Sequence, residues 1–296
     1  MTNRRNFIKK ASLFSAGLIV LPEISFRSVP AKEIGLQLYT VRDQIQQDLK
    51  GTLEKVAEIG YRTIEAAGYD NGKFYGLEPA AFGSLVTSTG MKVLSSHTTA
   101  QLPSLDSSES DVWKKVAEDT AGTGARYLVY AYLTEDKRKS LDDYKRLAEK
   151  FNKAAEICKK SGLIFGYHNH DFEFEEMGGE IPYDVLLNNT DPQLVKMEID
   201  LYWIIRAGKD PLEYFKKYPG RFELWHVKDM EPGKEKFFAE VGKGTIDFER
   251  IFARADEAGM KHIFVEQDRS RQDPFKSIRI SFDYLNNASF VRTYAS

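Results

Sequence analysis

The chain has little cysteine, little net charge and few long apolar runs, and each shortage excludes a class of protein. Its 296 residues include one cysteine, Cys158, so no disulfide can form within the chain. That cysteine lies in a helical pattern, AAEICKKSG, which indicates a small core residue. A net charge of −2 gives no support to a nucleic-acid or anionic-membrane partner. Hydrophobic residues make up 42% of the chain, enough for one large α/β domain or two smaller ones.

The first 31 residues differ from the rest of the chain. A basic stretch, MTNRRNFIKK, precedes an apolar stretch, ASLFSAGLIVLP, that is too short to anchor a protein stably in a bilayer. Arg4 and Arg5, followed by NFIK, resemble a twin-arginine export signal. We therefore expect residues 1–31 to be an export signal and the mature protein to be periplasmic, with no membrane span after processing. The alternative is an uncleaved anchor, and N-terminal sequencing of the exported protein, which should begin near Lys32, distinguishes the two.

Residues 32–296 alternate short apolar runs with longer amphipathic ones, and no linker divides them. Four helical patterns, among them DLKGTLEKVAEIG and YKRLAEKFNKAAEICKKSG, end on a glycine just before the next apolar run, where glycine can take the left-handed conformation that stops a helix. Eight such strand–helix units predict a single α/β domain, a (β/α)8 TIM barrel. An open doubly wound sheet is the alternative, but no Gly-rich turn follows the first strand. The expected strands are Ile34–Tyr39, Thr63–Ala66, Lys92–Ser96, Tyr127–Ala131, Leu163–His168, Val195–Asp200, Phe222–Val227 and His262–Glu266.

Polar residues gather at the ends of the last four expected strands. The carboxyl ends of barrel strands form the catalytic face of this fold, and successive side chains alternate between interior and exterior. In each of the last four expected strands, residues two positions apart therefore point to the same side of the strand, and the polar residues fall on the side expected to face the barrel interior. The four sets are Gly166, His168 and His170; Glu198 and Asp200; Leu224, His226 and Lys228; and Phe264, Glu266 and Asp268.

These residue types indicate a metal site. Interior positions of barrel strands are normally branched and apolar, and ionised groups there are costly unless they are paired or bound to metal. Taken singly, each residue is more often a solvated or structural side chain than a ligand. Imidazole and carboxylate ligands together suit Mn²⁺, Zn²⁺, Co²⁺ or Fe²⁺ better than Ca²⁺.

Four motifs give a family resemblance. IGLQLYTVRD, EIDLYWIIRAGKDP, LWHVKD and VGKGTIDFERI resemble segments of the sugar phosphate isomerase/epimerase family, the xylose-isomerase-like TIM barrels, and the resemblance covers the mature chain. It implies a divalent metal held by side chains of strands five to eight, where the family uses Glu, Asp, His and Glu. Asp200, His226 and Glu266 match the last three ligands. His168 stands at the first position, because the chain reads His168-Asn169-His170 where the family often reads Glu-Asn-His.

Two departures bear on the chemistry that the resemblance implies. In many family members the first and last glutamates flank the metal and move a proton between adjacent substrate carbons. With His168 in place of the first, a two-glutamate mechanism is in doubt, and proton transfer would fall to Glu266 with His170 or Lys228. Trp203 stands where many members carry a histidine, and it is either a stacking wall for a sugar or a core residue.

Other polar residues near the strand ends are candidates for supporting roles. Lys228 could polarise a carbonyl, or it could be an ordinary surface lysine. Glu65 and His97 could contact substrate hydroxyls or move protons. Glu198 could orient a ligand, pair with Lys228 or contact the substrate.

Together these observations predict a metal-dependent enzyme that removes a proton next to a carbonyl in a sugar or keto-sugar. Isomerisation, epimerisation and elimination remain open, as does the oligomeric state. The alternative from another class is a sugar-binding barrel without catalysis, although a binder need not keep Asp200, His226 and Glu266 together. A metal-dependent endonuclease of this fold is disfavoured, because it needs more ligands than five histidines supply and a basic face for DNA.

Overall fold

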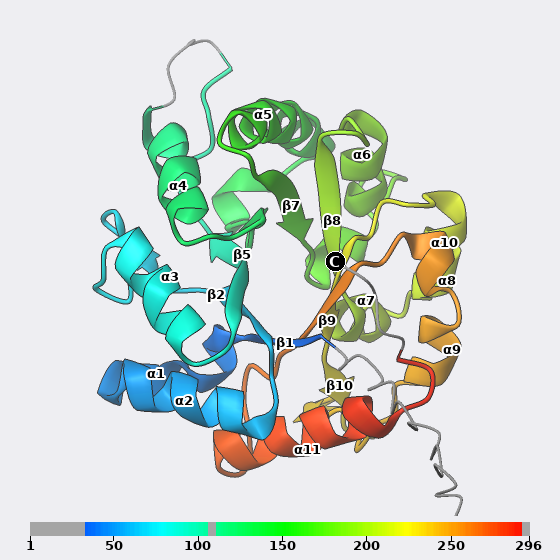
Figure 1. Cartoon of the computed structure of the whole chain (residues 1–296). Helices are drawn as coiled ribbons and strands as arrows, with labels where there is room; N and C mark the ends of the chain where they lie inside the picture. The colour runs from blue at the N-terminus through cyan, green and yellow to red at the C-terminus, as the bar shows by residue number, and fades with distance from the viewer. Residues whose placement is uncertain (1–32, 106–110, 292–296) are drawn as a thin grey trace, which may run out of the picture. The chain divides into compact units, whose positions relative to one another are not determined.

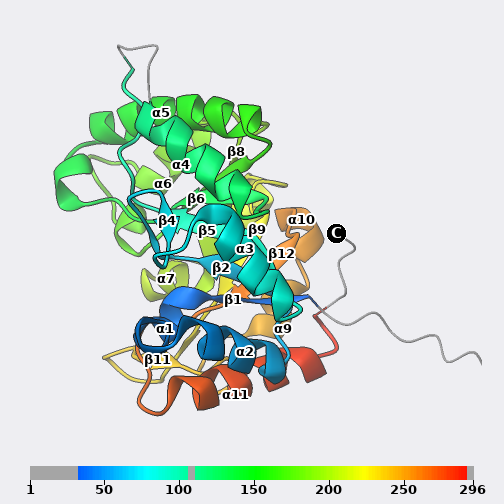
Figure 2. The same cartoon turned by 60° about the vertical axis from the view of Figure 1, so that its left-hand side comes forward.

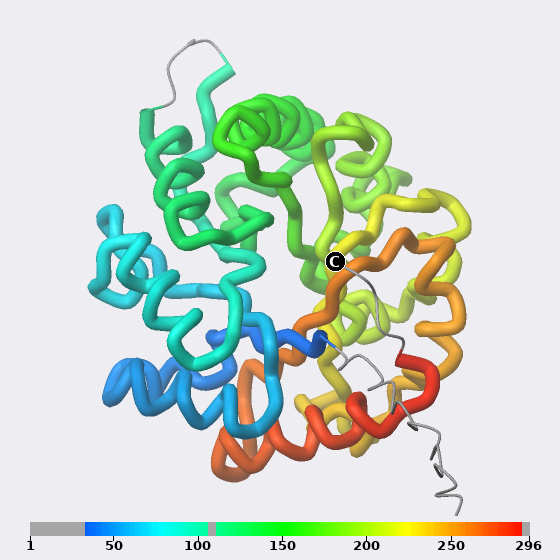
Figure 3. The backbone as a smooth tube through the Cα atoms, viewed as in Figure 1, coloured from blue at the N-terminus to red at the C-terminus, as the bar shows by residue number. Residues whose placement is uncertain are grey.

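Eight parallel strands close into a barrel, as the alternating sequence pattern predicts. The computed structural model describes residues 33–105 and 111–291, so the expected export signal lies outside the described residues. The hydrogen-bonded order is β1-β12-β9-β8-β7-β6-β5-β2, and β2 pairs with β1 to close the ring. Figure 3 shows the first and last strands side by side, in blue and orange. The barrel strands are β1 (Ile34–Gln37), β2 (Thr63–Ala66), β5 (Lys92–Thr98), β6 (Tyr127–Tyr130), β7 (Ile164–His168), β8 (Val195–Asp200), β9 (Leu224–Val227) and β12 (His262–Val265).

Helices surround this barrel on its outside (Figure 1). None of the helices in the described part of the chain is long and apolar enough to cross a membrane. The helices are α1 (Arg42–Gln47), α2 (Leu49–Ile59), α3 (Pro79–Ser88), α4 (Asp111–Gly122), α5 (Leu141–Lys160), α6 (Pro182–Asn189), α7 (Leu201–Arg206), α8 (Pro211–Lys217), α9 (Phe248–Phe252), α10 (Ala255–Ala258) and α11 (Pro274–Asn287). Figure 2 shows α2 and α11 lying together along one side of the barrel, where they contact each other.

The helix boundaries follow from capping. Ser140 precedes α5 and its hydroxyl accepts a hydrogen bond from the backbone N–H of Asp143, while Lys159 and Lys160 occupy the last turn, where the helix dipole favours cations. Gly162 follows with φ 79°, a left-handed conformation that ends the helix. Cys158 is fully buried on the inner face of α5, as its helical pattern indicates.

The structure differs from the expected elements by one or two residues at the ends of several strands and in one helix. The first strand ends at Gln37 rather than Tyr39, because the Gln37 side chain accepts a hydrogen bond from the Tyr39 backbone N–H and begins a 3-10 helix, η1 (Leu38–Val41). The expected helix over DFERIFARADEAGM is two short helices, because Arg254 leaves helical geometry at φ −111° and ψ 15°.

The loops contain short hairpins and 3-10 turns. The strand pattern of the sequence does not predict them. One hairpin follows β2 and another follows β9. Asp229 organises the second, since its carboxylate accepts hydrogen bonds from the backbone N–H groups of Met230, Gly242, Gly244 and Ile246. These elements are β3 (Tyr69–Asp70), β4 (Lys73–Phe74), β10 (Asp229–Met230), β11 (Phe238–Ala239), η2 (Glu135–Lys137) and η3 (Phe172–Phe174).

A small apolar cluster fills the barrel interior. Leu224 and Phe264 lie there with Tyr127 and Val129, all fully buried, which agrees with the side predicted from strand alternation. Gly35 on β1 leaves room for the Phe264 ring, because a Cβ at position 35 would lie 2.4 Å from it. The polar strand ends therefore stand on a packed apolar floor.

We predict that Gly35→Val destabilises the barrel by about 1–3 kcal/mol, because the added side chain must displace the Phe264 ring. Urea unfolding of the purified chain measures the loss. The double variant with Phe264→Leu should recover part of the stability if the clash is the cause. A Gly35→Val protein as stable as the parent would show that the interior is not tightly packed at this point.

Candidate functional site

Seven polar side chains form a layer at the carboxyl ends of the barrel strands, just beyond the apolar floor. They come from β2, β5, β7, β8, β9 and the residue that follows β12. Six are buried, and the seventh, His97, exposes only 11% of its side chain. Burying so many ionisable groups is costly unless they neutralise one another or hold an ion. We call this layer the polar cluster; it consists of Glu65, His97, His168, Glu198, Asp200, His226 and Glu266.

His226 lies at the centre of the polar cluster. Its Nδ1 lies 2.9 Å from Oε2 of Glu266, and its Nε2 lies 2.6 Å from Oε2 of Glu65 and 3.2 Å from Oε2 of Glu198. Burial alone would lower the imidazole pKa, but these three carboxylates outweigh it and hold the pKa of His226 well above its usual value. The surroundings of this ring therefore favour positive charge.

Glu198 and His97 make a second contact within the polar cluster. Nε2 of His97 lies 2.6 Å from Oε2 of Glu198 and 3.1 Å from Oε2 of Glu65. Burial opposes protonation of His97, but the two carboxylates prevail and raise its pKa to about 10. Glu198 contacts imidazoles rather than the side chain of Lys228, one of the partners considered from sequence. Its Oε1 is buried without a hydrogen-bond partner among the described residues.

Four members of the polar cluster could hold a divalent ion. One ligand atom from each of His168, Asp200, His226 and Glu266 lies within 4.8 Å of the others, and all four residues are buried. Nδ1 of His168 lies 3.1 Å from Glu198, which leaves Nε2 on the side of Asp200, 3.8 Å from its Oδ2. An imidazole oriented by a carboxylate through its other nitrogen is a common arrangement in metal sites. The donor set and the preference for positive charge therefore fit a divalent cation.

A second set of donors overlaps the first. His97, His168, Glu198 and His226 also bring their ligand atoms within 4.8 Å of one another. Because the two sets share His168 and His226, they describe neighbouring parts of one polar cluster. Asn169, which sequence analysis quoted only as part of a motif, joins the ends of β7 and β8 by accepting a hydrogen bond from the Asp200 backbone N–H.

Lys228 lies at the edge of the polar cluster and is fully buried, which rules out the surface lysine considered from sequence. Its Nζ lies 2.9 Å from Asp200, 2.7 Å from Glu266 and 2.7 Å from Asp268. Burial opposes its charge, but these three carboxylates hold its pKa well above the usual value, so it is a fixed cation. Sequence analysis assigned no role to Asp268, although strand alternation placed it on the same side as Glu266.

A cavity of about 530 Å³ opens above the polar cluster, and we call it the first cavity. Pockets of this size hold small-molecule ligands. Six of the residues singled out from sequence line it: His97, His168, His170, Trp203, Lys228 and Glu266. Glu65 and Glu198, expected to bind substrate, have no exposed surface and lie outside this lining, and Asp200 and His226 likewise lie beneath it.

The loop after β7 presents His170 to the first cavity. Its ring stacks on Phe172 at 5.5 Å between centroids and meets the edge of Tyr132 at 5.0 Å. Burial, reinforced by the nearby charge of Lys228, lowers the pKa of His170 to about 3, so the ring is neutral. Its Nδ1 is buried and has no hydrogen-bond partner among the described residues.

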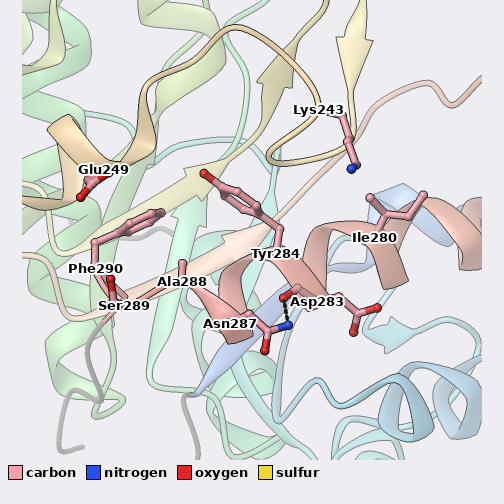
Figure 4. Close-up of a pocket in the computed structure, with 9 residues that line it drawn as sticks. All are labelled: Lys243, Glu249, Ile280, Asp283, Tyr284, Asn287, Ala288, Ser289 and Phe290. Carbon is pink, nitrogen blue, oxygen red and sulfur yellow. Dashed lines mark hydrogen bonds between the residues drawn. The ribbon is translucent and has the colours of Figure 1, made fainter.

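A separate pocket on another part of the molecule, drawn in Figure 4, lacks the metal-donor and imidazole side chains of the first cavity. It lies beside the end of α11 and is lined by residues that include Lys243, Asp283, Tyr284 and Phe290. Among its described lining residues there is no imidazole and no set of metal donors. The donor sets that could hold a metal in the described part of the chain therefore lie at the first cavity.

Glu173, which sequence analysis did not identify, holds the β7 loop in place. It is fully buried, accepts a hydrogen bond of 2.8 Å from the His170 backbone N–H, and also accepts one from the Tyr167 hydroxyl. Burial raises its pKa from the ordinary 4.5 to about 7, although both hydrogen bonds oppose the rise. Because the folded-state pKa is raised, the stability that this group contributes is full below about pH 4.5 and is lost as the pH rises through 7.

We therefore predict that Glu173→Gln removes part of the pH dependence of unfolding. Between pH 4.5 and pH 8 the variant should gain stability relative to the parent by on the order of 3 kcal/mol. Urea unfolding of chelator-treated protein across this range measures the difference. The exposed Glu176→Gln on the same loop is the control and should follow the parent. A difference between Glu173→Gln and parent that does not change with pH would contradict the prediction.

Known proteins resemble this chain over most of its length. A sugar phosphate isomerase/epimerase from Parabacteroides distasonis ATCC 8503 is 32% identical; the match covers 90% of this chain and 98% of that chain, with a TM-score of 0.78. An inosose dehydratase from Geobacillus kaustophilus (strain HTA426) is 24% identical over 287 residues, which cover 85% of this chain and 89% of that protein. The structure of the IOLI protein with a bound zinc atom shares the fold at 16% identity, covering 89% of this chain and 99% of that chain with a TM-score of 0.68.

The family model described as xylose isomerase-like TIM barrel matches residues 53–288, which include the strands from β2 to β12 and every member of the polar cluster. The chain therefore belongs to the xylose isomerase-like TIM barrel family.

Proposed function

We propose that this protein is a divalent-metal-dependent enzyme that acts on a sugar or keto-sugar by removing a proton next to a carbonyl. The observation that carries the proposal is the buried donor set of His168, Asp200, His226 and Glu266 directly beneath the first cavity. The relatives named as an inosose dehydratase and a sugar phosphate isomerase/epimerase support a carbohydrate substrate.

The ion is proposed to be Mn²⁺, Zn²⁺, Co²⁺ or Fe²⁺, because two imidazoles and two carboxylates suit these metals. When bound, such an ion supplies Lewis-acid polarisation of substrate oxygens, which makes an adjacent carbon-bound proton easier to remove. The residues beneath the donor set have a supporting task. Glu198 orients His168, and Glu65 orients His226 through its Nε2.

Lys228 is proposed to stabilise negative charge rather than to accept a proton. Three carboxylates keep it protonated, and it lines the first cavity beside Glu266. A cation fixed in this position favours an oxyanion developing on the substrate and needs no rearrangement during the reaction.

Proton transfer is proposed to fall to Glu266 and His170, which both line the first cavity. The pKa of the Glu266 carboxyl is well below its usual value, since Lys228 and His226 outweigh its burial, so the carboxyl is ionised. His170 is neutral and has an unpartnered Nδ1. One carboxylate and one imidazole are unlike the two matched glutamates of a symmetric epimerase, which favours elimination of water among the candidate reactions.

A sugar-binding barrel without catalysis is the weaker candidate. Binding alone does not require a buried donor set together with a fixed lysine cation, because burying both costs stability. We also propose, from the pattern of residues 1–31, that the protein is exported to the periplasm.

We predict that the purified protein holds about one divalent transition-metal ion per chain and that Asp200→Ala and His226→Ala abolish this binding, because each removes a donor from the set. Elemental analysis of the folded variants measures the loss. His168→Glu should retain the metal, since a carboxylate can occupy the same position. Full metal content in both alanine variants would refute the site, and normal content in His168→Ala would reduce it to three ligands.

We predict that Lys228→Met and His170→Ala lower kcat by roughly 10²-fold or more while the metal content stays near normal. NMR in deuterated water, with inososes and keto-sugars as candidate substrates, measures turnover and identifies the carbon that exchanges its proton. Lys243→Met, which changes a lysine of the pocket in Figure 4, is the matched control and should retain full activity. Metal-loaded parent protein that neither exchanges protons nor turns over any of these compounds would favour the sugar-binding barrel.

A further inference from the structure

A second cavity of about 520 Å³ adjoins the first. The two share Tyr39, Trp203 and Asp268 in their linings, so these side chains stand between them. The rest of the second cavity comes from Arg42 at the start of α1, residues of α7, the β10–β11 hairpin and the segment after β12. The first cavity is large enough for a single sugar ring over the donor set, and a neighbouring space of similar size therefore offers room for a further group.

Aromatic rings form much of the second cavity. Tyr202 and Phe238 stack with 4.6 Å between ring centroids, and Phe237 follows Phe238 at 5.7 Å. Trp203, on the boundary with the first cavity, meets Phe238 edge-on at 5.9 Å. Tyr202 is buried, whereas Trp203, Phe237 and Phe238 are half-buried. The guanidinium of Arg271 lies 4.2 Å from the centroid of the Phe237 ring. A second ring, from either a sugar or an aromatic group, can stack on the apolar surface that the half-buried rings leave uncovered.

Three arginines line the same cavity, and its two acidic residues, Glu235 and Asp268, pair with cations outside this lining, Arg271 and Lys228. Arg42 donates hydrogen bonds to the backbone carbonyls of Tyr39 and Asp268, and its guanidinium lies 4.1 Å above the Tyr39 ring. Arg269 is exposed at the cavity edge. Within residues 33–105 and 111–291, neither arginine forms an ion pair with a carboxylate, whereas Arg206 in the same lining pairs with Asp171. The charge of Arg42 and Arg269 therefore remains available to an acidic or oxygen-rich group on a ligand.

We propose that the second cavity binds the second ring of a two-ring substrate, so that the natural substrate is a glycoside of a keto-sugar whose carbonyl-bearing ring lies over the donor set. The second ring stacks on the aromatic wall near Phe237, and an acidic substituent on it faces Arg269. This inference rests on the proposed function, because it takes the first cavity to be the place of the reacting sugar.

Isothermal titration of the metal-loaded full-length chain tests the proposal with four glucosides. Methyl β-D-glucopyranoside has one ring, phenyl β-D-glucopyranoside and cellobiose have two, and 4-carboxyphenyl β-D-glucopyranoside adds an anion. The expected result is a Kd about tenfold lower for a two-ring ligand than for the methyl glucoside, with a further gain of about threefold for the carboxylate. A gain with phenyl glucoside alone identifies an aromatic second ring, and a gain with cellobiose identifies a sugar.

Two variants and a control separate the parts of the second cavity. Phe237→Ala should remove most of the gain from the second ring, and Arg269→Ala should remove only the gain from the carboxylate. Arg279→Ala changes an exposed arginine of α11 outside both cavity linings and should behave as the parent. Metal content and binding of the methyl glucoside should stay unchanged in all three.

The outcomes distinguish this inference from the proposed function. If the methyl glucoside binds in a metal-dependent way and a second ring adds nothing, the second cavity is not a subsite and the proposed function stands. The same conclusion follows if the gain survives Phe237→Ala and Arg269→Ala together. If none of the four glucosides binds to metal-loaded protein, the inference is overturned, whereas the proposed function depends on the turnover of inososes and keto-sugars.

Discussion

The distribution of charge around His226 is the constraint on which the rest of the structure depends. Four carboxylates of the polar cluster are buried in one layer of the barrel, and isolated ionised groups are too costly to bury there. His226 contacts Glu65, Glu198 and Glu266, and Lys228 contacts the remaining carboxylate, Asp200. The same negative surroundings that hold a proton on His226 suit a divalent cation beside its Nδ1. The buried carboxylates are therefore neutralised by His226 and Lys228, and the same residues offer the negative charge and the donor atoms that a divalent cation requires.

The barrel makes this arrangement possible by separating its apolar and polar layers. Leu224 and Phe264 fill the interior below, and the residues two positions further along their strands, His226 and Glu266, enter the polar cluster. Because the interior below is packed, the polar residues face only the open mouth of the barrel. Loops then decide what reaches them: the β7 loop, held by Glu173, presents His170 to the first cavity.

One substitution sets this protein apart from the family pattern that its motifs resemble. His168 stands where a glutamate is usual, and it removes one negative charge from the donor set. The structure offers a physical reason why an imidazole fits, since Glu198 lies 3.1 Å from its Nδ1 and leaves Nε2 on the side of Asp200. A neutral ligand would leave a divalent ion at this site a stronger Lewis acid, in keeping with the proposed reaction, which relies on one carboxylate rather than two for proton transfer.

The sequence by itself determined the barrel and the end of the barrel at which the polar strand-end residues gather. Strand alternation predicted that His226 lies on the same side of its strand as Leu224, and Glu266 on the same side as Phe264. This prediction needs only the sequence, because the two-residue period of a strand is a property of the local backbone. The family motifs supplied the position of His168. Export remains a prediction from residues 1–31.

Only the tertiary structure decided how these residues contact one another. The burial of Lys228 among three carboxylates and the placement of Glu65 and Glu198 beneath the first cavity depend on distances between strands that are far apart in sequence. A lysine on a strand end has the same local pattern whether its neighbours are water or carboxylates. The second cavity is likewise lined by segments that are far apart in sequence, the first at Tyr39 and the last at Arg269. These segments lie together because the barrel closes, so no single segment predicts the cavity.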